Sequence, residues 1–579
     1  MSLYDWGVLL LFFAYVIWDG SKSHKKNTDL EGMLLAKRSM PGWALGLSVM
    51  ATQASAITFI GTTGQAFFYD MRFIQVYLGL PLAMIFLSIT LLPMYRRARP
   101  FTAYESLEKK FGLKVRLATS FLFLLSRGIS LGLSIAAPAY LLSWILQLSL
   151  EFTILIIGIS TTVYTLFGGL DGVVRTDVKQ MVLLVFGLIF CFCWIIYNLP
   201  PELGINEALH LSGAVGKLKS IDLSFDLSNK YSLWSGMLAG FFLMLSYFGT
   251  DQSQVQRYLS AASLKDARNS LMMSAGLKIP MQFFILLLGA FLYCFYLFAD
   301  RPLMFLPDRF HSESPTEVRT EGDAEFQKIH EARKKAAYAY VEDLDQAELK
   351  ENFIQLDKQA QKLRKKELIS MAKENHKLRN DLNYVMPYFI LHELPPGIIG
   401  LIIAAILAAA LSSIDSALNA LATVSVIDWY RRLRKEKKSD QHDLKASRWF
   451  TVFWGFIATC FAFLFGETES IIELVNQMGS YFYGPILGVF ALLWIKRIDG
   501  KSALWGLVLG LLGVLFIASI FVDRYNGQIE FHLPLGLTPY THKPLIEYLW
   551  LNPIGVFLCV GFAYFLSFLP GKGPDSHST

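Results

Sequence analysis

Apolar runs long enough to cross a lipid bilayer recur along this chain of 579 residues and limit the folds open to it. A membrane-spanning helix needs about 20 mostly apolar residues, and roughly a dozen runs approach that length. The composition agrees, since 54% of the residues are hydrophobic and only 17% are charged. A transmembrane barrel would instead show alternating segments of about 10 residues. The sequence therefore predicts an all-α polytopic membrane protein.

About thirteen spans fit the apolar runs. They cover residues 4–19, 43–66, 74–95, 117–147, 152–168, 177–199, 233–256, 270–298, 387–428, 447–466, 471–495, 503–522 and 545–569. With this division, about 28 Lys and Arg residues lie in the loops of one side and about 6 in the short loops of the other. Because basic loops stay in the cytoplasm, we expect a cell (inner) membrane protein with its N-terminus outside and its C-terminus cytoplasmic.

Residues 299–386 break the membrane pattern, because they are rich in Glu, Lys, Gln and Ala. The stretch 324–380 has a helix-forming composition with few Gly or Pro residues, which predicts one or two exposed helices. The topology places them outside, since long loops cross the membrane largely regardless of charge. They form either a solvated helical hairpin or a lid or docking surface for a partner.

Polar groups interrupt the apolar run at 408–430. Ser412, Ser413 and Ser416, with Asp415 beside them, offer hard oxygen ligands to a small cation. Such groups are costly at membrane depth unless they face a partner or a cavity, so they mark a functional site. This stretch indicates an ion-coupled transporter.

Two other spans contain polar interruptions, at 48–64 and at 246–257. A helix broken near the membrane midplane frees carbonyls and half-helix ends that can bind ions and substrate. The two interruptions lie five spans apart, and a repeat of five helices must invert across the membrane. The alternatives are helix packing through small residues at 48–64, and an ordinary cytoplasmic helix end for part of 250–257.

Asp177 follows a glycine pair, Gly168 and Gly169, between the fifth and sixth spans. Thr176 or Asp177 can cap the next helix, because a side-chain oxygen there satisfies free N–H groups. Alternatively, Asp177 and the Ser416 region share a cation route to the cytoplasm.

Other classes of protein find little support in the chain. It has no nucleotide loop, elbow serine or His/Cys set with metal-ligand spacing, so we expect no enzyme, no cofactor and no metal other than the coupling ion. A membrane transferase would need a reactive pair such as His392 and Glu393, which also fits a helix end. A transporter-like sensor would need a signalling domain after the last span, where only a short tail follows. The basic residues serve topology, so we expect no nucleic-acid partner.

Three motifs, in order, resemble the sodium:solute symporter family, which includes sodium-coupled transporters of sugars, proline, pantothenate, sialic acid and iodide. They read Gly-Gly-x-x-x-Val-x-x-Thr-Asp-x-x-Gln at 168–180, Ser-Ser-x-x-Ser-x-Leu-Asn-x-x-x-Thr-x-x-x-x-Asp-x-Tyr at 412–430 and Gly-Pro-Ile-Leu-Gly-Val-Phe at 484–490. The resemblance covers about residues 1–298 and 387–569. It implies a LeuT-type five-plus-five inverted repeat, with the second to eleventh spans as its core.

The resemblance also implies a division of the chain. An extra helix and a cytoplasmic loop occupy residues 1–42. Core helices one to six then occupy 43–256, and core helix seven occupies 257–298. The charged insert follows at 299–386, core helices eight to ten at 387–495, and two extra helices with a short tail at 496–579.

The family's main sodium site joins its first and eighth core helices. By resemblance, Ala51, Ala54 and Ala409 supply backbone carbonyls here, and Ser412 and Ser413 supply hydroxyls. Some members have a second sodium site, whose matching positions are Asp177, Asp415 and Ser416. Asp415 stands where those members carry Ser, which implies a tighter cation site, a proton site or an ion pair.

Substrate groups in the family come from the broken first core helix, the helix after it, and core helices three, six and ten. The matching candidates are Ser55, Thr58, Gln75, Arg127, Tyr247 and Gln477. Arg127 can bind a carboxylate bidentately, as in the sialic-acid branch, or serve a structural ion pair.

The resemblance implies a sodium-coupled secondary active symporter that imports a small polar solute by alternating access. The solute is a sugar, a sialic acid or another organic acid. We expect a monomer or weak oligomer whose partners are the solute, sodium and the lipid bilayer, with sodium as the coupling ion.

Overall fold

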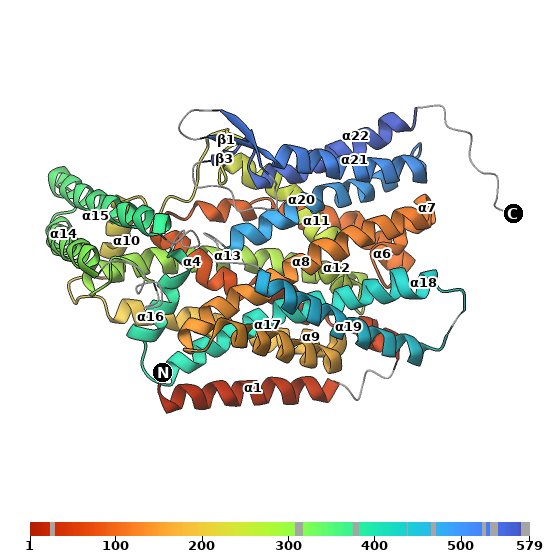
Figure 1. Ribbon diagram of the computed structural model, residues 1–579, viewed down its shortest axis with the longest axis horizontal. Helices are drawn as coiled ribbons and strands as arrows, with labels where there is room; N and C mark the ends of the chain where they lie inside the picture. Colours follow the sequence, from red (N-terminus) through yellow and green to blue (C-terminus); the bar gives the residue numbers. More distant parts are fainter. Residues whose placement is uncertain are drawn as a thin grey trace.

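The structure is a computed structural model that describes residues 1–23, 29–306, 316–374, 381–436, 438–464, 471–523, 528–532 and 542–568. It is an elongated bundle of helices that run roughly parallel to the long axis (Figure 1). The hairpin of α14 and α15 and the start of α1 lie at one end, which we call the hairpin end. The helices α6, α7 and α18 lie at the opposite end (Figure 1).

The described helices and strands follow one another in this order. They are α1 (Leu3–Ser23), α2 (Leu30–Leu35), α3 (Gly42–Gln53), α4 (Ala56–Phe68), α5 (Leu80–Ile89), α6 (Leu91–Ala98), α7 (Glu105–Phe111), α8 (Leu113–Ile145), α9 (Leu150–Tyr197), α10 (Ile205–Ala214), α11 (Gly240–Thr250), α12 (Gln252–Leu259), α13 (Leu264–Phe298), α14 (Thr316–Glu342), α15 (Ala347–Glu374), α16 (Val385–Glu393), α17 (Ile398–Val424), α18 (Arg431–Leu433), α19 (Asp440–Leu464), α20 (Ile471–Ala491), α21 (Gly500–Ala518), β1 (Ile520–Asp523), β2 (Ile529–Phe531), β3 (His542–Pro544) and α22 (Leu551–Leu566).

Every span predicted from the sequence overlaps helix in the structure, although the span 503–522 ends in strand β1. Within the described residues, 8 helices are long and apolar enough to cross a membrane, or 9 when the bent pair α3–α4 counts as one span. Three of the other predicted spans are shorter apolar helices, at Leu3–Val16, Leu150–Leu166 and Ser235–Thr250. The fifth and sixth predicted spans form one helix, α9, which kinks at Gly169 with a φ of 54°.

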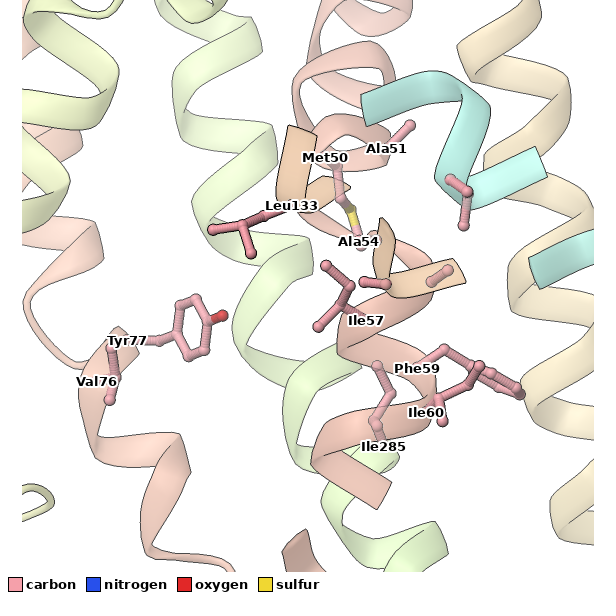
Figure 2. Packing of buried hydrophobic residues seen from close by; sticks show 14 of the residues in the cluster. Met50, Ala51, Ala54, Ile57, Phe59, Ile60, Val76, Tyr77, Leu133 and Ile285 are labelled. Carbon is pink, nitrogen blue, oxygen red and sulfur yellow. The ribbon is translucent and has the colours of Figure 1, made fainter. Parts of the chain in front are cut away.

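The first predicted interruption is a break between α3 and α4, whose axes bend by 56°. Ala54 leaves the helical conformation (φ −88°, ψ 61°), and the Ser55 hydroxyl caps α4 by accepting the Thr58 N–H. Figure 2 shows buried apolar side chains on both sides of this break, with Tyr77 close by. The chain thus keeps an irregular backbone where protein surrounds it, as a break inside a membrane requires.

The second predicted interruption is a break at Asp251, between α11 and α12. Asp251 is extended (φ −77°, ψ 119°), and its side chain caps α12 by accepting the Ser253 N–H. Both breaks expected for an inverted repeat are therefore present.

Three features differ from, or add to, the sequence prediction. The ninth predicted span is divided, because Pro395 and Pro396 separate α16 from α17 and proline disfavours helix before it. Asp177 lies inside α9 and caps no helix. The small antiparallel sheet β2-β1-β3 follows α21 and was not predicted.

The charged insert forms two helices, where its composition predicts one or two. Its helices α14 and α15 pack against each other and also contact α10 and α13 at the hairpin end. The insert therefore rests on the helical bundle.

Candidate functional site

The α3–α4 break meets α17 through Ser413. The Ser413 hydroxyl lies 3.2 Å from the Thr52 carbonyl oxygen and 3.2 Å from the Ala409 carbonyl oxygen, and donates to both. Ala51 and Ala54 are buried in the same region. The structure therefore brings together the end of α3, the break after it and the middle of α17, which carry four of the five residues predicted for the main sodium site; Ser412 is the exception.

Ser412 faces the other way, toward α9. Its hydroxyl donates to Asp177 at 2.5 Å, and the Ser48 hydroxyl of α3 donates to the same carboxylate at 2.5 Å. Asp177 is fully buried. A carboxylate inside the bundle therefore lies between α3 and α17.

Arg257 of α12 brings a positive charge to this carboxylate. Its Nη2 lies 3.1 Å from an Asp177 oxygen, 2.5 Å from the Thr52 hydroxyl, and within hydrogen-bond distance of the Ser416 hydroxyl. The guanidinium thus hydrogen-bonds to Asp177 and Ser416, two of the three residues predicted for a second cation site. Sequence reasoning missed Arg257, because it lies after a helix break on a different element.

Asp415 is the third of those residues and is fully buried. One of its oxygens accepts from the Ser416 hydroxyl at 3.1 Å, and Oδ2 has no hydrogen-bond partner. A buried carboxylate oxygen without a donor is costly, so this position is poised to accept a proton or a cation.

A cavity of about 140 Å³ lies beside the α3–α4 break. Four of the predicted substrate residues line it, namely Ser55, Thr58, Arg127 and Tyr247, and so does Ser413. Its wall also contains Thr52, Gln53, Tyr77, Ser130, Ser134, Asn476 and Tyr483. The cavity therefore joins hydroxyls, aromatic rings and one guanidinium to the residues predicted for sodium.

Arg127 is held by the second broken helix. Its Nη2 donates to Asp251 at 2.5 Å and to the Ser253 hydroxyl at 2.8 Å, and its guanidinium lies 5.6 Å from the Tyr247 ring centre. Arg127 Nε has no hydrogen-bond partner. The ion pair predicted as the structural alternative is present, and Arg127 also lines the cavity.

Gln75 and Gln477 do not line the cavity. Gln75 donates to the Tyr231 carbonyl at 3.0 Å and accepts the Asp222 N–H at 3.1 Å, so its amide serves the loop before α11. Gln477 donates to the Tyr481 hydroxyl at 2.8 Å on its own helix. Tyr77 and Asn476, which lie close to them in sequence, line the cavity instead.

Lys278 is a further buried cation that sequence reasoning missed. Its Nζ donates to the Gln53 carbonyl at 3.3 Å, at the end of α3, and lies 4.9 Å from the Tyr77 ring centre. An intramembrane lysine is itself a functional signal, and its place in the apolar span 270–298 marked it.

The pair His392 and Glu393 forms the end of α16. The His392 ring stacks on Tyr388 at 4.0 Å, and its Nδ1 lies 3.0 Å from the Tyr388 carbonyl. The helix-end interpretation therefore accounts for this pair.

Comparisons with known proteins agree with the family resemblance of the three sequence motifs. The sequence model of the sodium:solute symporter family matches residues 33–316 and 372–510. The sodium/sialic acid symporter NanT of Aliivibrio fischeri is 27% identical over 532 residues, which cover 90% of this chain and 89% of NanT. The corresponding symporter SiaT of Proteus mirabilis is 26% identical and covers 92% of each chain. The mouse sodium-coupled monocarboxylate transporter 2 is 23% identical over 98% of this chain and 83% of its own.

The fold is also that of a solved structure, a Na+-coupled sialic acid symporter in its substrate-bound outward-open state. The two structures superpose with a TM-score of 0.73 over 98% of both chains, at 23% identity. The LeuT-type fold is therefore confirmed, and the protein is a multi-pass transporter with sodium as its coupling ion and not an enzyme. The chain belongs to the sodium:solute symporter family.

Proposed function

We propose that this symporter takes up a small organic acid together with sodium, and that the acid's carboxylate binds Arg127. The observation that carries the proposal is Arg127 itself, the one guanidinium among the described residues that line the cavity. Asp251 and Ser253 hold its Nη2 and so fix the orientation of the guanidinium. A carboxylate that accepts from the guanidinium adds a charge-assisted hydrogen bond to a donor already aimed.

Sodium binds between the α3–α4 break and α17 in this proposal. The ligands are the carbonyls of Ala51, Ala54 and Ala409 and the hydroxyl of Ser413, which are hard oxygens that suit a small cation. Ser412 joins them in this proposal when its hydroxyl turns away from Asp177, to which it donates in the structure. Ser413 lines the cavity and also hydrogen-bonds to Thr52 and Ala409. Sodium bound there stabilises the break that shapes the cavity, so sodium raises substrate affinity and substrate raises sodium affinity equally.

The free energy released by sodium entry is sufficient to accumulate the solute inside the cell. One sodium ion that moves inward through about 100 mV releases about 2.3 kcal/mol. A tenfold sodium gradient adds about 1.4 kcal/mol.

The relatives narrow the class of substrate. NanT and SiaT carry sialic acid, and the mouse relative carries monocarboxylates, all of which are acids. Hydroxyls on the cavity wall, from Ser55, Thr58, Ser130 and Ser134, suit a hydroxylated acid such as a sialic acid. A sialic acid is therefore the substrate to test first, and a short monocarboxylate the second.

A second cation site at Asp177, Asp415 and Ser416 is part of the proposal. The support is the buried Asp415 Oδ2 without a donor. The sodium dependence of uptake tests it, because a Hill coefficient can reach the number of coupled sites. We expect a value above about 1 that falls toward about 1 in Asp415→Asn. A Hill coefficient of about 1 in both proteins would refute the proposed second site.

The proposed orientation places the hairpin end outside the cell. The opposite end carries basic residues on α6, α7 and α18, among them Arg96, Lys110 and Arg432, as expected for a cytoplasmic face. The hairpin α14–α15 is then extracytoplasmic and is the surface open to a partner. We propose a monomer or weak oligomer.

Uptake of radiolabelled sialic acid and of lactate into proteoliposomes, with and without a sodium gradient, tests the function. Ser413→Ala should abolish most sodium-driven uptake, and Ser274→Ala should not. Ser274 is a matched control, because it is buried in α13 and its hydroxyl, among the residues that the structure describes, donates only to the Leu271 carbonyl of the same helix, at 2.8 Å. Uptake that is indifferent to sodium in the unmodified protein would refute the proposal.

A further inference from the structure

Four cationic side chains meet beneath the insert at the hairpin end. Lys217 follows α10, Arg301 follows α13, Arg333 belongs to α14 and Arg364 to α15. The first three are 3%, 8% and 1% exposed. We call these four residues the cation cluster.

Aromatic rings hold the cation cluster together. Lys217 and Arg333 lie 5.1 and 6.0 Å from the ring centre of Tyr293. Arg301 lies 5.9 Å from Phe67, and Arg364 lies 3.5 Å from Phe68. The Phe67 ring is 4.8 Å from Phe68 and 6.0 Å from Tyr293, so all four cations surround one aromatic patch.

Two carboxylates, Asp357 and Asp381, form ion pairs with the cation cluster, and each is already engaged; Asp70 also acts on Lys217 from farther away. Asp357 accepts from Arg333 at 3.0 Å, from the Tyr293 hydroxyl at 2.6 Å and from Gln361 at 2.6 Å. Asp381 pairs with Arg364 and accepts the Phe305 N–H at 2.9 Å. The cluster therefore has more positive than negative charge.

Lys217 and Arg301 are the cations without a carboxylate. In the described part of the chain, neither forms an ion pair within 4.0 Å. Lys217 Nζ donates to the Phe68 carbonyl at 2.7 Å, and Arg301 Nε has no hydrogen-bond partner. Buried charges are normally paired, so two unpaired cations at one aromatic patch need an explanation.

The electrostatics agree with this geometry. Burial and the nearby Arg301 and Arg364 lower the pKa of Lys217 to about 8, although Asp357 and Asp70 oppose the effect. Burial and repulsion from Arg333 lower the pKa of Arg301 to about 9. The neighbouring His330 is kept neutral, because burial lowers its pKa to about 3, and it adds no charge.

We propose that a small monovalent inorganic anion of chloride size binds in the cation cluster, between Lys217 and Arg301 and beneath the α14–α15 hairpin. The anion supplies the negative charge that Asp357 and Asp381 do not, and it fastens the hairpin to α4, α10 and α13. Arg333 and Arg364 lie in the part of the insert that the family's sequence model leaves unmatched, whereas Lys217 and Arg301 lie within the matched range 33–316.

Thermal unfolding of the purified full chain tests the site without any substrate. Sodium is held constant while gluconate is replaced by chloride, so that only the anion changes. An anion that binds the folded state raises the melting temperature as its concentration rises. We expect this rise in the unmodified protein and in Lys335→Gln, and a rise at least about fivefold smaller in Arg301→Gln and in Lys217→Met. Lys335 is the matched control, because it is an exposed cation of the same hairpin.

A second measurement needs no variant. Bromide in place of chloride should give an anomalous scattering peak between Lys217 and Arg301 in crystals of the unmodified protein. A melting temperature that is equal in chloride and gluconate, together with no bromide peak, would overturn the proposal. A response to acetate without one to chloride would overturn the inorganic assignment and indicate a carboxylate.

Discussion

The guanidinium of Arg257 lies 3.1 Å from the carboxylate of Asp177, and the two side chains are 1% and 0% exposed. This pair connects α12, which follows the second helix break, to α9. Ser48 of α3 and Ser412 of α17 complete the set by donating to the same carboxylate at 2.5 Å each. Four helices of the transporter therefore meet at one buried ion pair.

Removing Arg257 should destabilise the protein strongly. Arg257→Gln leaves Asp177 buried with two hydroxyl donors but no opposite charge, and breaking a buried pair costs about 3–5 kcal/mol. Thermal unfolding in detergent measures the loss. The control is Asp19→Asn, whose partner Lys179 is 44% exposed, and which should cost at most about 1 kcal/mol. Equal losses in the two variants would contradict this prediction.

Replacing Arg127 by Lys should weaken substrate binding. Lysine keeps the charge and loses the planar fork, which bonds Asp251 in the structure and, in our proposal, the substrate as well. We expect KM for an acidic substrate to rise about tenfold or more, which corresponds to about 1.4 kcal/mol. Uptake kinetics measure it, with Arg72→Lys as a control in a partly exposed ion pair with Asp70 and Asp222. An unchanged KM in Arg127→Lys would mean that the Asp251 pair is purely structural.

Gly64→Ala should distort the contact between α4 and the segment before α16. A Cβ at Gly64 would lie 2.0 Å from the Leu382 carbonyl oxygen. This clash is with a backbone atom, so the backbone itself must move to relieve it. Overpacking of this kind costs about 1–3 kcal/mol. Gly61→Ala on the same helix is the control, because its Cβ would find its nearest atom, of Asn383, at 3.6 Å. The melting temperatures should fall for the first variant only.

Stability in a chloride-free buffer should rise with pH between about 8 and 10.5. The folded protein lowers the pKa of Lys217 from 10.5 to about 8, so the unfolded chain binds more protons in that range. The charged groups that face Lys217 are Asp357, Arg364, Arg301 and Asp70. The free energy of unfolding should increase by about 3 kcal/mol across this range, as the unfavourable charge of Lys217 is lost.

The measurement is denaturation at a series of pH values. Lys217→Met should flatten the slope, because it removes the titrating group and keeps the apolar stem. A slope that persists in Lys217→Met would assign the effect to another group.

The helices and their breaks were predictable because they depend on local composition. Apolar length decides a span, and polar residues next to small ones marked both Ala54 and Asp251. The charged insert was recognisable as one or two helices for the same reason. Each of these properties belongs to a continuous stretch of chain, and no knowledge of its neighbours is needed.

The side-chain constellations were predictable only in part. Ser413 and Arg127 were found, because a polar group inside an apolar run is conspicuous. Gln75 was placed at the cavity, yet its amide bonds to the loop before α11 and Tyr77 faces the cavity instead. The rotation of a helix decides which of two nearby residues faces inward, and spacing alone does not report it. Arg257 was missed because its long side chain crosses to three other helices.

The hairpin α14–α15 lies outside the bundle, yet it contacts helices that belong to the transporter core. Arg364 of α15 lies over the Phe68 ring of α4 at 3.5 Å, and Asp357 of α15 accepts from Tyr293 of α13 at 2.6 Å. The second half of the broken helix and α13 are thereby tethered to one exposed element. An antibody fragment or nanobody raised against α14–α15 can therefore hold these two helices in one arrangement and trap a single state for structure determination.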